Sequence, residues 1–158
     1  MRRIALLVAA LLFLVACSGL GSAGTPVPTA PPTAAPPPHA VAITAIQLRG
    51  TGSAQPDEYV EITNVVDVSV DLSGWKVVAG DEDQYFIFPA SYVLAPGESC
   101  RLYTNQVEGD SCGGKSFGYD RPIWDNNKDC GQVIDGRGAL VSEVCRKDSE
   151  PPETTPVP

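Results

Sequence analysis

The chain has 158 residues, which is enough for one domain with flanking segments. Its 19 acidic residues outnumber its 11 basic residues and give a formal net charge of -8. A surface of this charge repels phosphate backbones, so the composition argues against a nucleic-acid-binding function.

Residues 1–16 have the pattern of a signal peptide. Arg2 and Arg3 precede a continuous apolar run at 4–16, which is shorter than the roughly 20 residues that span a hydrocarbon core. The run ends in Leu14-Val15-Ala16-Cys17, which resembles the lipobox of bacterial lipoproteins. The resemblance implies that Cys17 is alkylated with diacylglycerol and that the chain is cut before it. The alternative is an ordinary secretory signal with a chance cysteine.

Residues 17–40 are predicted to be a lipidated cysteine and a spacer. The segment after Cys17 is rich in proline, threonine and alanine, with no charged residue and almost no large apolar one. It cannot form a core, and its prolines favour an extended conformation of about 3.1 Å per residue. His39, the only histidine in the chain, falls in this spacer and is expected to be solvated.

The next segments alternate as half-buried β-strands do. Residues 41–49 are predicted to be the first strand, with a change of phase near Ala45 that indicates a β-bulge. In residues 58–63, Val60 and Ile62 lie on one face. Residues 68–72 alternate again, and a turn at Ser73-Gly74 leads to a strand that begins at Trp75.

The rest of the chain gives shorter strands separated by turns. We expect strands at 84–88, 93–94 and 99–104, a turn at Pro96-Gly97, and a hairpin of 131–135 with 139–145. The glycine-rich loop at 105–121 is long enough to be either functional or stapled. The charged, proline-rich residues 147–158 are predicted to be a disordered tail.

Many short strands without a helical period predict an all-β sandwich at residues 41–146. A large indole next to a turn is most often a core residue, which is how we interpret Trp75. The predicted core consists of Val60, Ile62, Leu72, Trp75, Phe88, Leu102 and Leu140.

Four cysteines remain in the predicted domain once Cys17 is assigned to lipid. An even number in a small exported domain suggests two disulfides, and four cysteines allow three pairings. The favoured pairing is Cys100–Cys112, which bracket a strand and the loop after it, with Cys130–Cys145 near the open ends of the hairpin. A regular turn would place Cys130 opposite Glu143, so the second pair requires a bulge.

Several segments, in order, resemble the bacterial form of the lamin tail domain. They are EYVEITN at 58–64, DLSGW at 71–75, FIFPASYVLAPGES at 86–99 and IWDNN at 123–127, followed by the closing segments at 133–135 and 138–141. The resemblance covers roughly residues 40–146. It implies an immunoglobulin-like β-sandwich that docks to other molecules rather than catalysing a reaction.

The sequence offers no catalytic arrangement. Ser-His-Asp and Cys-His mechanisms need a positioned base, but His39 lies in the spacer and the cysteines are expected to be oxidised. We therefore expect neither an enzyme nor a cofactor. Oxygen ligands alternate from Asp125 to Asp129 as in calcium loops, but Cys130 and Gly136 stand where an EF-hand requires glycine and glutamate, so no metal is expected.

Trp124, Asp125 and Asn127 remain candidates for ligand contact, because they follow a glycine-rich loop; a core position for Trp124 is the alternative. The prediction is an extracytoplasmic lipoprotein of the bacterial cell envelope, anchored to membrane lipid through Cys17. Its domain would act as a non-catalytic binding or scaffolding module for an unidentified envelope protein or glycan, not for nucleic acid. The alternative is a carbohydrate- or calcium-binding module.

Overall fold

The computed structural model describes residues 39–147. The predictions for the signal peptide, for Cys17, for most of the spacer and for the tail from residue 148 lie outside the described residues. The strands are β1 (Val41–Gln47), β2 (Tyr59–Asn64), β3 (Val70–Asp71), β4 (Lys76–Ala79), β5 (Tyr85–Ile87), β6 (Val93–Leu94), β7 (Ser99–Tyr103), β8 (Lys128–Ile134) and β9 (Leu140–Lys147). A short 3-10 helix, η1 (Cys112–Gly114), lies between β7 and β8.

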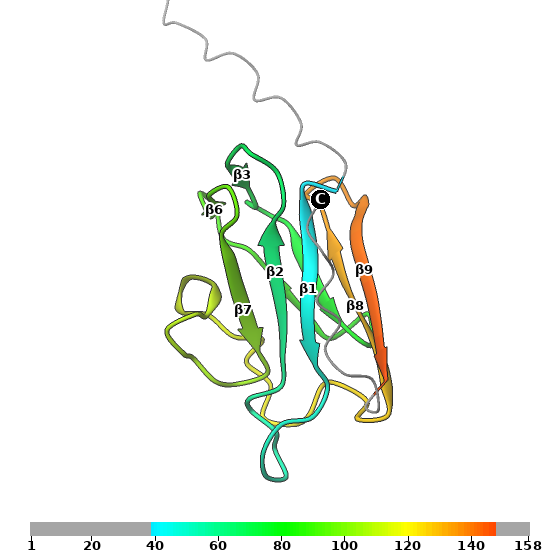
Figure 1. Cartoon of the computed structure of the whole chain (residues 1–158). Coiled ribbons are helices and arrows are strands. Elements are labelled where there is room, and N and C mark those ends of the chain that lie inside the picture. Colours follow the sequence, from blue (N-terminus) through cyan, green and yellow to red (C-terminus); the bar gives the residue numbers. More distant parts are fainter. Residues whose placement is uncertain (1–38, 148–158) are drawn as a thin grey trace, which may run out of the picture. The chain divides into compact units, whose positions relative to one another are not determined.

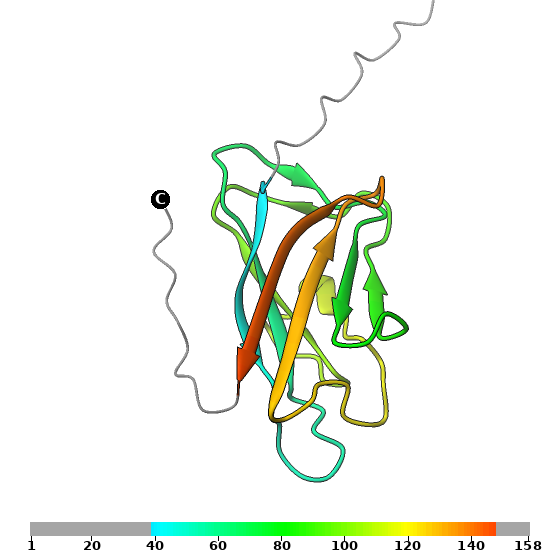
Figure 2. The same ribbon diagram turned by 90° about the vertical axis from the view of Figure 1, so that its right-hand side faces the viewer.

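These strands form an antiparallel sandwich (Figure 1). One sheet has the order β1-β2-β7 and the facing sheet has the order β5-β4-β8-β9. A small β3-β6 pair lies at the end of the sandwich where β1 begins. Figure 1 shows the three-stranded sheet in front. Figure 2 shows the four-stranded sheet, in which β8 and β9 are orange.

The first sheet follows the predicted alternation. The expected bulge in β1 is confirmed, because the register with β2 shifts between Ile43 and Ala45. Val60 and Ile62 are both fully buried between the sheets. The strand expected at 68–72 is shorter than predicted, since only Val70–Asp71 pairs with β6. The Asp71 carboxylate accepts the Ser73 N–H at 2.9 Å and so turns the chain out of the ladder.

The core is the predicted one except at Leu140. Trp75 is 4% exposed, and Leu72, Phe88 and Leu102 are also buried. Leu140 is 55% exposed, so its placement in the core was wrong. The register of the β8–β9 hairpin shifts between Val133 and Ile134, which leaves Leu140 opposite Ile134 and gives the buried position to Val141. One residue of slip is enough to turn a side chain to the other face.

The same shift decides the second disulfide. Cys130 lies directly opposite Cys145 in the ladder, and Glu143 lies opposite Gln132. The structure has the bonds Cys100–Cys112 and Cys130–Cys145, so the favoured pairing and its required bulge are confirmed.

Candidate binding cleft

The connecting segments of both sheets gather at one end of the sandwich. Gln47 at the end of β1 lies opposite Tyr59, and Tyr59 lies opposite Tyr103 at the end of β7. In the other sheet, β4 ends opposite the beginning of β8. The residues between β1 and β2, between β4 and β5, and between β7 and β8 therefore share the end away from the beginning of β1, which is the lower end in Figure 1. We call it the loop end.

A polar cleft of about 380 Å³ opens at the loop end. Its lining comes from the β4–β5 turn, from the segment before β8, and from the first residues of β8: Asp81, Gln84, Pro122, Ile123, Trp124, Asp125, Lys128 and Asp129. Two of the three predicted contact residues, Trp124 and Asp125, therefore belong to the cleft, and Asn127 is not among its lining residues.

Trp124 is a core residue that reaches the cleft wall. It is 3% exposed and meets Phe117 edge to face, with ring centroids 6.4 Å apart. A Cβ atom on Gly131 would lie 3.3 Å from the Trp124 ring, so glycine at this position of β8 makes room for the indole. A sugar stacks on an exposed aromatic face, and Trp124 offers none. The core alternative is therefore the one that the structure supports.

Asp125 and Asn127 bind each other. The Asp125 carboxylate accepts the Asn127 backbone N–H at 2.8 Å and its side-chain amide at 3.1 Å. The pKa of Asp125 lies below its usual value, mainly because of the hydrogen bond from the Asn127 backbone and also because of the bond from the Asn127 side chain. Both side chains serve a local turn that leads into β8.

Asp129 also lines the cleft and holds its neighbours by hydrogen bonds. Its carboxylate accepts the backbone N–H groups of Asp125 at 2.9 Å and of Cys130 at 2.8 Å. It lies against Gly80, which has a positive φ of 64° and leaves no room for a Cβ atom. Among the described residues, no group of three or more His, Cys, Asp or Glu side chains could hold a metal ion. The carboxylates of Asp125 and Asp129 thus hold the local turns of the chain around the cleft.

A buried carboxyl group lies behind the cleft. Glu58 is fully buried, and its Oε2 atom accepts the Thr104 hydroxyl at 2.9 Å and the Ile123 N–H at 3.2 Å. Its Oε1 atom has no partner. Burial raises the pKa of Glu58. Glu58 thereby ties the cleft segment to the three-stranded sheet.

Sequence reasoning missed this role of Glu58, although a signal was present. Glu58 has the same parity as Val60 and Ile62, so the alternation of β2 points it inward. Gln84 was missed for a different reason. It is buried, and with its amide oriented to suit its neighbours it donates to the carbonyls of Ala79 and Ile123. That contact joins two separate segments of the chain, and no hydrophobic periodicity within either segment indicates that they meet.

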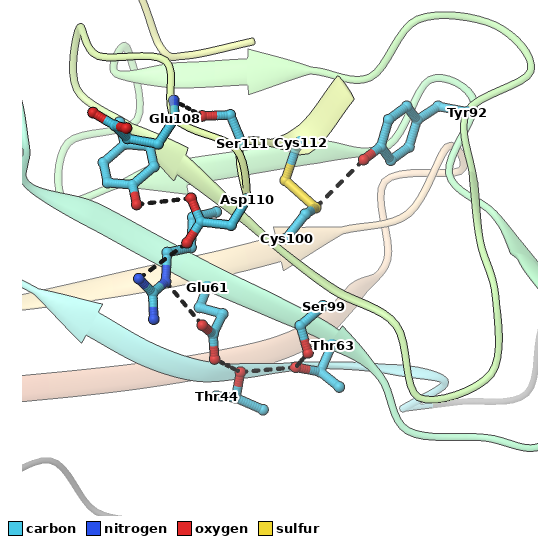
Figure 3. The surroundings of a disulfide bond; sticks show 12 residues. Thr44, Glu61, Thr63, Tyr92, Ser99, Cys100, Glu108, Asp110, Ser111 and Cys112 are labelled. Carbon is cyan, nitrogen blue, oxygen red and sulfur yellow. Dashed lines mark hydrogen bonds and ion pairs between the residues drawn. A yellow bond between two sulfur atoms is a disulfide. The ribbon is translucent and has the colours of Figure 1, made fainter. Parts of the chain in front are cut away.

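The long loop after β7 is stapled to the sheet, as Figure 3 shows around the Cys100–Cys112 bond. Arg101 binds Glu61 at 2.9 Å and Asp110 at 3.1 Å, and its guanidinium lies 4.4 Å from the centroid of the Tyr59 ring. The Tyr103 hydroxyl donates to Asp110 at 2.9 Å. These contacts fix the part of the loop that follows β7.

His39 lies at the other end of the sandwich, beside the start of β1. It is exposed, as expected for a solvated residue, but its Nδ1 atom donates to the Val141 carbonyl at 3.0 Å. His39 is therefore close to β9 and at the opposite end of the sandwich from the cleft. No helix within residues 39–147 is long and apolar enough to cross a membrane.

Two facing antiparallel sheets, a core between them and loops gathered at one end define an immunoglobulin-like β-sandwich. The particular family follows from the sequence comparison. The family model described as Lamin Tail Domain matches residues 34–148, which is most of the chain, and the chain belongs to this family. A search of curated proteins finds no match.

Proposed function

We propose that the protein is a membrane-anchored extracytoplasmic lipoprotein whose lamin tail domain is a non-catalytic binding or scaffolding module at the cell envelope. The observation that carries this proposal is the pair of disulfides in a chain whose Cys17 follows a lipobox-like segment. Disulfides persist in oxidising, extracytoplasmic compartments. A lipid on Cys17 would supply the membrane attachment, since two acyl chains anchor stably where one does not.

The spacer joins the domain at a defined end of the sandwich. β1 begins at the end of the sandwich opposite the loop end, so a chain coming from Cys17 enters the domain there. A proline-rich spacer from 18 to 38 would reach roughly 65 Å in a polyproline II conformation. The cleft belongs to the end of the domain that the spacer does not enter, and it is the candidate contact surface for a partner.

The chemistry of the cleft suits a group that donates hydrogen bonds. Asp81, Asp125 and Asp129 line it against the single cation Lys128. A basic or hydroxyl-rich segment of an envelope protein or glycan matches this lining. The carbohydrate- or calcium-binding alternative has less support, because Trp124 is buried and the described residues contain no group of three or more His, Cys, Asp or Glu side chains that could hold a metal ion.

The anchor is tested by replacing Cys17 with Ser in the full chain. The wild type should take up an alkyne-labelled fatty acid and partition with membranes. The Cys17→Ser variant should lose the label and become soluble or remain an uncut precursor, with both disulfides intact by mass. A wild type that takes no label and stays in the aqueous phase of a detergent extraction contradicts the anchor.

The binding role is tested with a photo-crosslinking residue in intact cells. The site variant carries it at Lys128, on the cleft, and the matched control carries it at Arg137, an exposed position in the β8–β9 turn at the opposite end. We expect a defined crosslinked product from position 128 only. Products from position 137 alone, or equal products from both, would place the binding surface elsewhere.

A further inference from the structure

The two main sheets have four edge strands, and three of the edges are covered. The β7 edge is covered by the loop after it, because Arg101 N–H donates to Asp110 O at 2.9 Å and Phe117 N–H donates to Tyr103 O at 2.8 Å. β1 and β9 cover each other: Ile43 N–H donates to the Ser142 hydroxyl at 3.1 Å. The remaining edge is β5, the outermost green strand at the right of Figure 2.

The hydrogen-bond register leaves this edge open. Ala79 N–H donates to Gln84 O at 2.8 Å, and Phe88 N–H donates to Trp75 O at 2.9 Å. Bonded pairs alternate along an antiparallel ladder, so Phe86 also bonds to β4, while the backbone N–H and C=O groups of Tyr85 and Ile87 point away from it. Within residues 39–147 no other residue bonds to these outward groups.

The exposed strand is apolar as well as open. Tyr85 is 44% exposed and Ile87 is 53% exposed. Residues 84–89 carry no charge, although natural edge strands are usually protected by charged side chains. The protection present is the short length of β5, Pro89 just after it, and Lys76 on β4, whose ammonium lies 5.4 Å from the centroid of the Tyr85 ring. An uncharged edge of aromatic and β-branched residues favours addition of another strand.

We propose that β5 pairs antiparallel with β5 of a second copy of the chain, about a two-fold axis at Phe86. Tyr85 then lies opposite Ile87 of the second copy, and Ile87 opposite its Tyr85. Both pairs use outward N–H and C=O groups, so each pair exchanges two hydrogen bonds. Aromatic and β-branched residues are a favourable cross-strand pair. The strand is thus complementary to itself, and the two four-stranded sheets become one.

Charge is compatible with this pairing despite the net charge of -8. The acidic turn at Asp81, Glu82 and Asp83 directly precedes β5. An antiparallel arrangement places the two acidic turns at opposite ends of the paired strands, each near Pro89 of the other copy. A parallel arrangement would bring them together. The charges therefore select the antiparallel register.

The contact is small, so the pairing is expected to be weak in dilute solution. Stable dimers usually bury well over about 1,000 Å², more than two short strands can supply. Confinement of both copies to one membrane would raise their effective concentration. This enhancement rests on the proposed anchor, but the pairing itself does not.

The test places a photo-crosslinking residue at Tyr85 in the full chain, purified with or without detergent as its solubility requires. A mixture of unlabelled and ¹⁵N-labelled chains distinguishes crosslinks between copies from those within one copy. We expect mixed-isotope products that join position 85 to the peptide that contains Ile87. This readout does not need the lipid, so its failure is distinct from failure of the anchor.

Two lysine variants give the matched control. Ile87→Lys places a charge on the edge strand, and Leu140→Lys places one at an equally exposed position on β9. Ile87→Lys should lower the yield of the homodimer at least fivefold, and Leu140→Lys should leave it unchanged, with both disulfides intact by mass in each. Absence of mixed-isotope homodimer, or an unaffected yield with Ile87→Lys, would overturn the proposal.

Discussion

Replacing Trp75 with Ala tests the core directly. Trp75 is 4% exposed, and its backbone N–H and C=O bond to Leu72 and Phe88, bonds that an alanine retains. The loss is therefore one of side-chain packing. A buried tryptophan removes about 200 Å² from water, which at about 25 cal/mol per Å² corresponds to about 5 kcal/mol. Measured losses for such truncations are about 3–5 kcal/mol, a large part of the stability of a small domain.

The assay is urea unfolding followed by the fluorescence of Trp124, which remains in the variant. With a slope of about 2 kcal/mol per molar urea, the midpoint should fall by roughly 2 M. Ile87→Ala is the control, because Ile87 is half exposed and surface substitutions usually change stability by less than about 0.5 kcal/mol. A Trp75→Ala variant with the midpoint of the control would falsify the core assignment.

Three further predictions concern Glu58, the disulfides and Gly80. Because burial raises the pKa of Glu58 in the folded state, its charged form costs stability above that pKa, and the cost is relieved as pH falls through it. The stability of the wild type relative to Glu58→Gln should therefore improve between pH 7 and pH 4 in urea titrations, and a pH-independent difference would contradict a buried titrating carboxyl. Under limiting reductant, the Cys130–Cys145 bond should open before the Cys100–Cys112 bond, because Cys145 is exposed whereas Cys100 and Cys112 are 6% and 1% exposed. Alkylation of the freed thiols followed by peptide mapping would show the order. The reverse order would refute the argument from accessibility. Gly80→Ala should cost more than Gly97→Ala, because both glycines have positive φ but only Gly80 meets the Asp129 carboxylate; equal melting temperatures would show that this contact contributes nothing.

Local periodicity predicted the strands that have one buried face. Val60 and Ile62 alternate with the half-buried Tyr59 and Glu61, and the bulge near Ala45 interrupts the alternation of the first strand. Leu140 was misplaced because the slip in the hairpin depends on how the Asp135 carboxylate accepts the N–H groups of Arg137 and Ala139. The apolar character of Leu140 alone does not indicate how this turn sets the register of the hairpin.

The cleft could be predicted only in part, because its contacts join distant segments. Asp125 and Trp124 were found from their position after the glycine-rich loop. The packing of Asp129 under Gly80 and the bond from Ile123 to Glu58 cross from one strand connection to another. Nothing in a single strand's pattern encodes such pairs, since each member is an ordinary turn or strand residue by itself.

The position of β1 has a mechanical consequence. Its first residue, Val41, lies opposite the last residue of β2, and β1 ends at the loop end, where the cleft residues lie. A pull on the chain before Val41, resisted by a partner held at the loop end, acts along β1 and slides it past β2. The hydrogen bonds of that ladder are then loaded together in shear, instead of being unzipped one at a time. If the protein is anchored and binds a partner as proposed, this geometry would let the domain transmit tension between the two through the β1–β2 ladder.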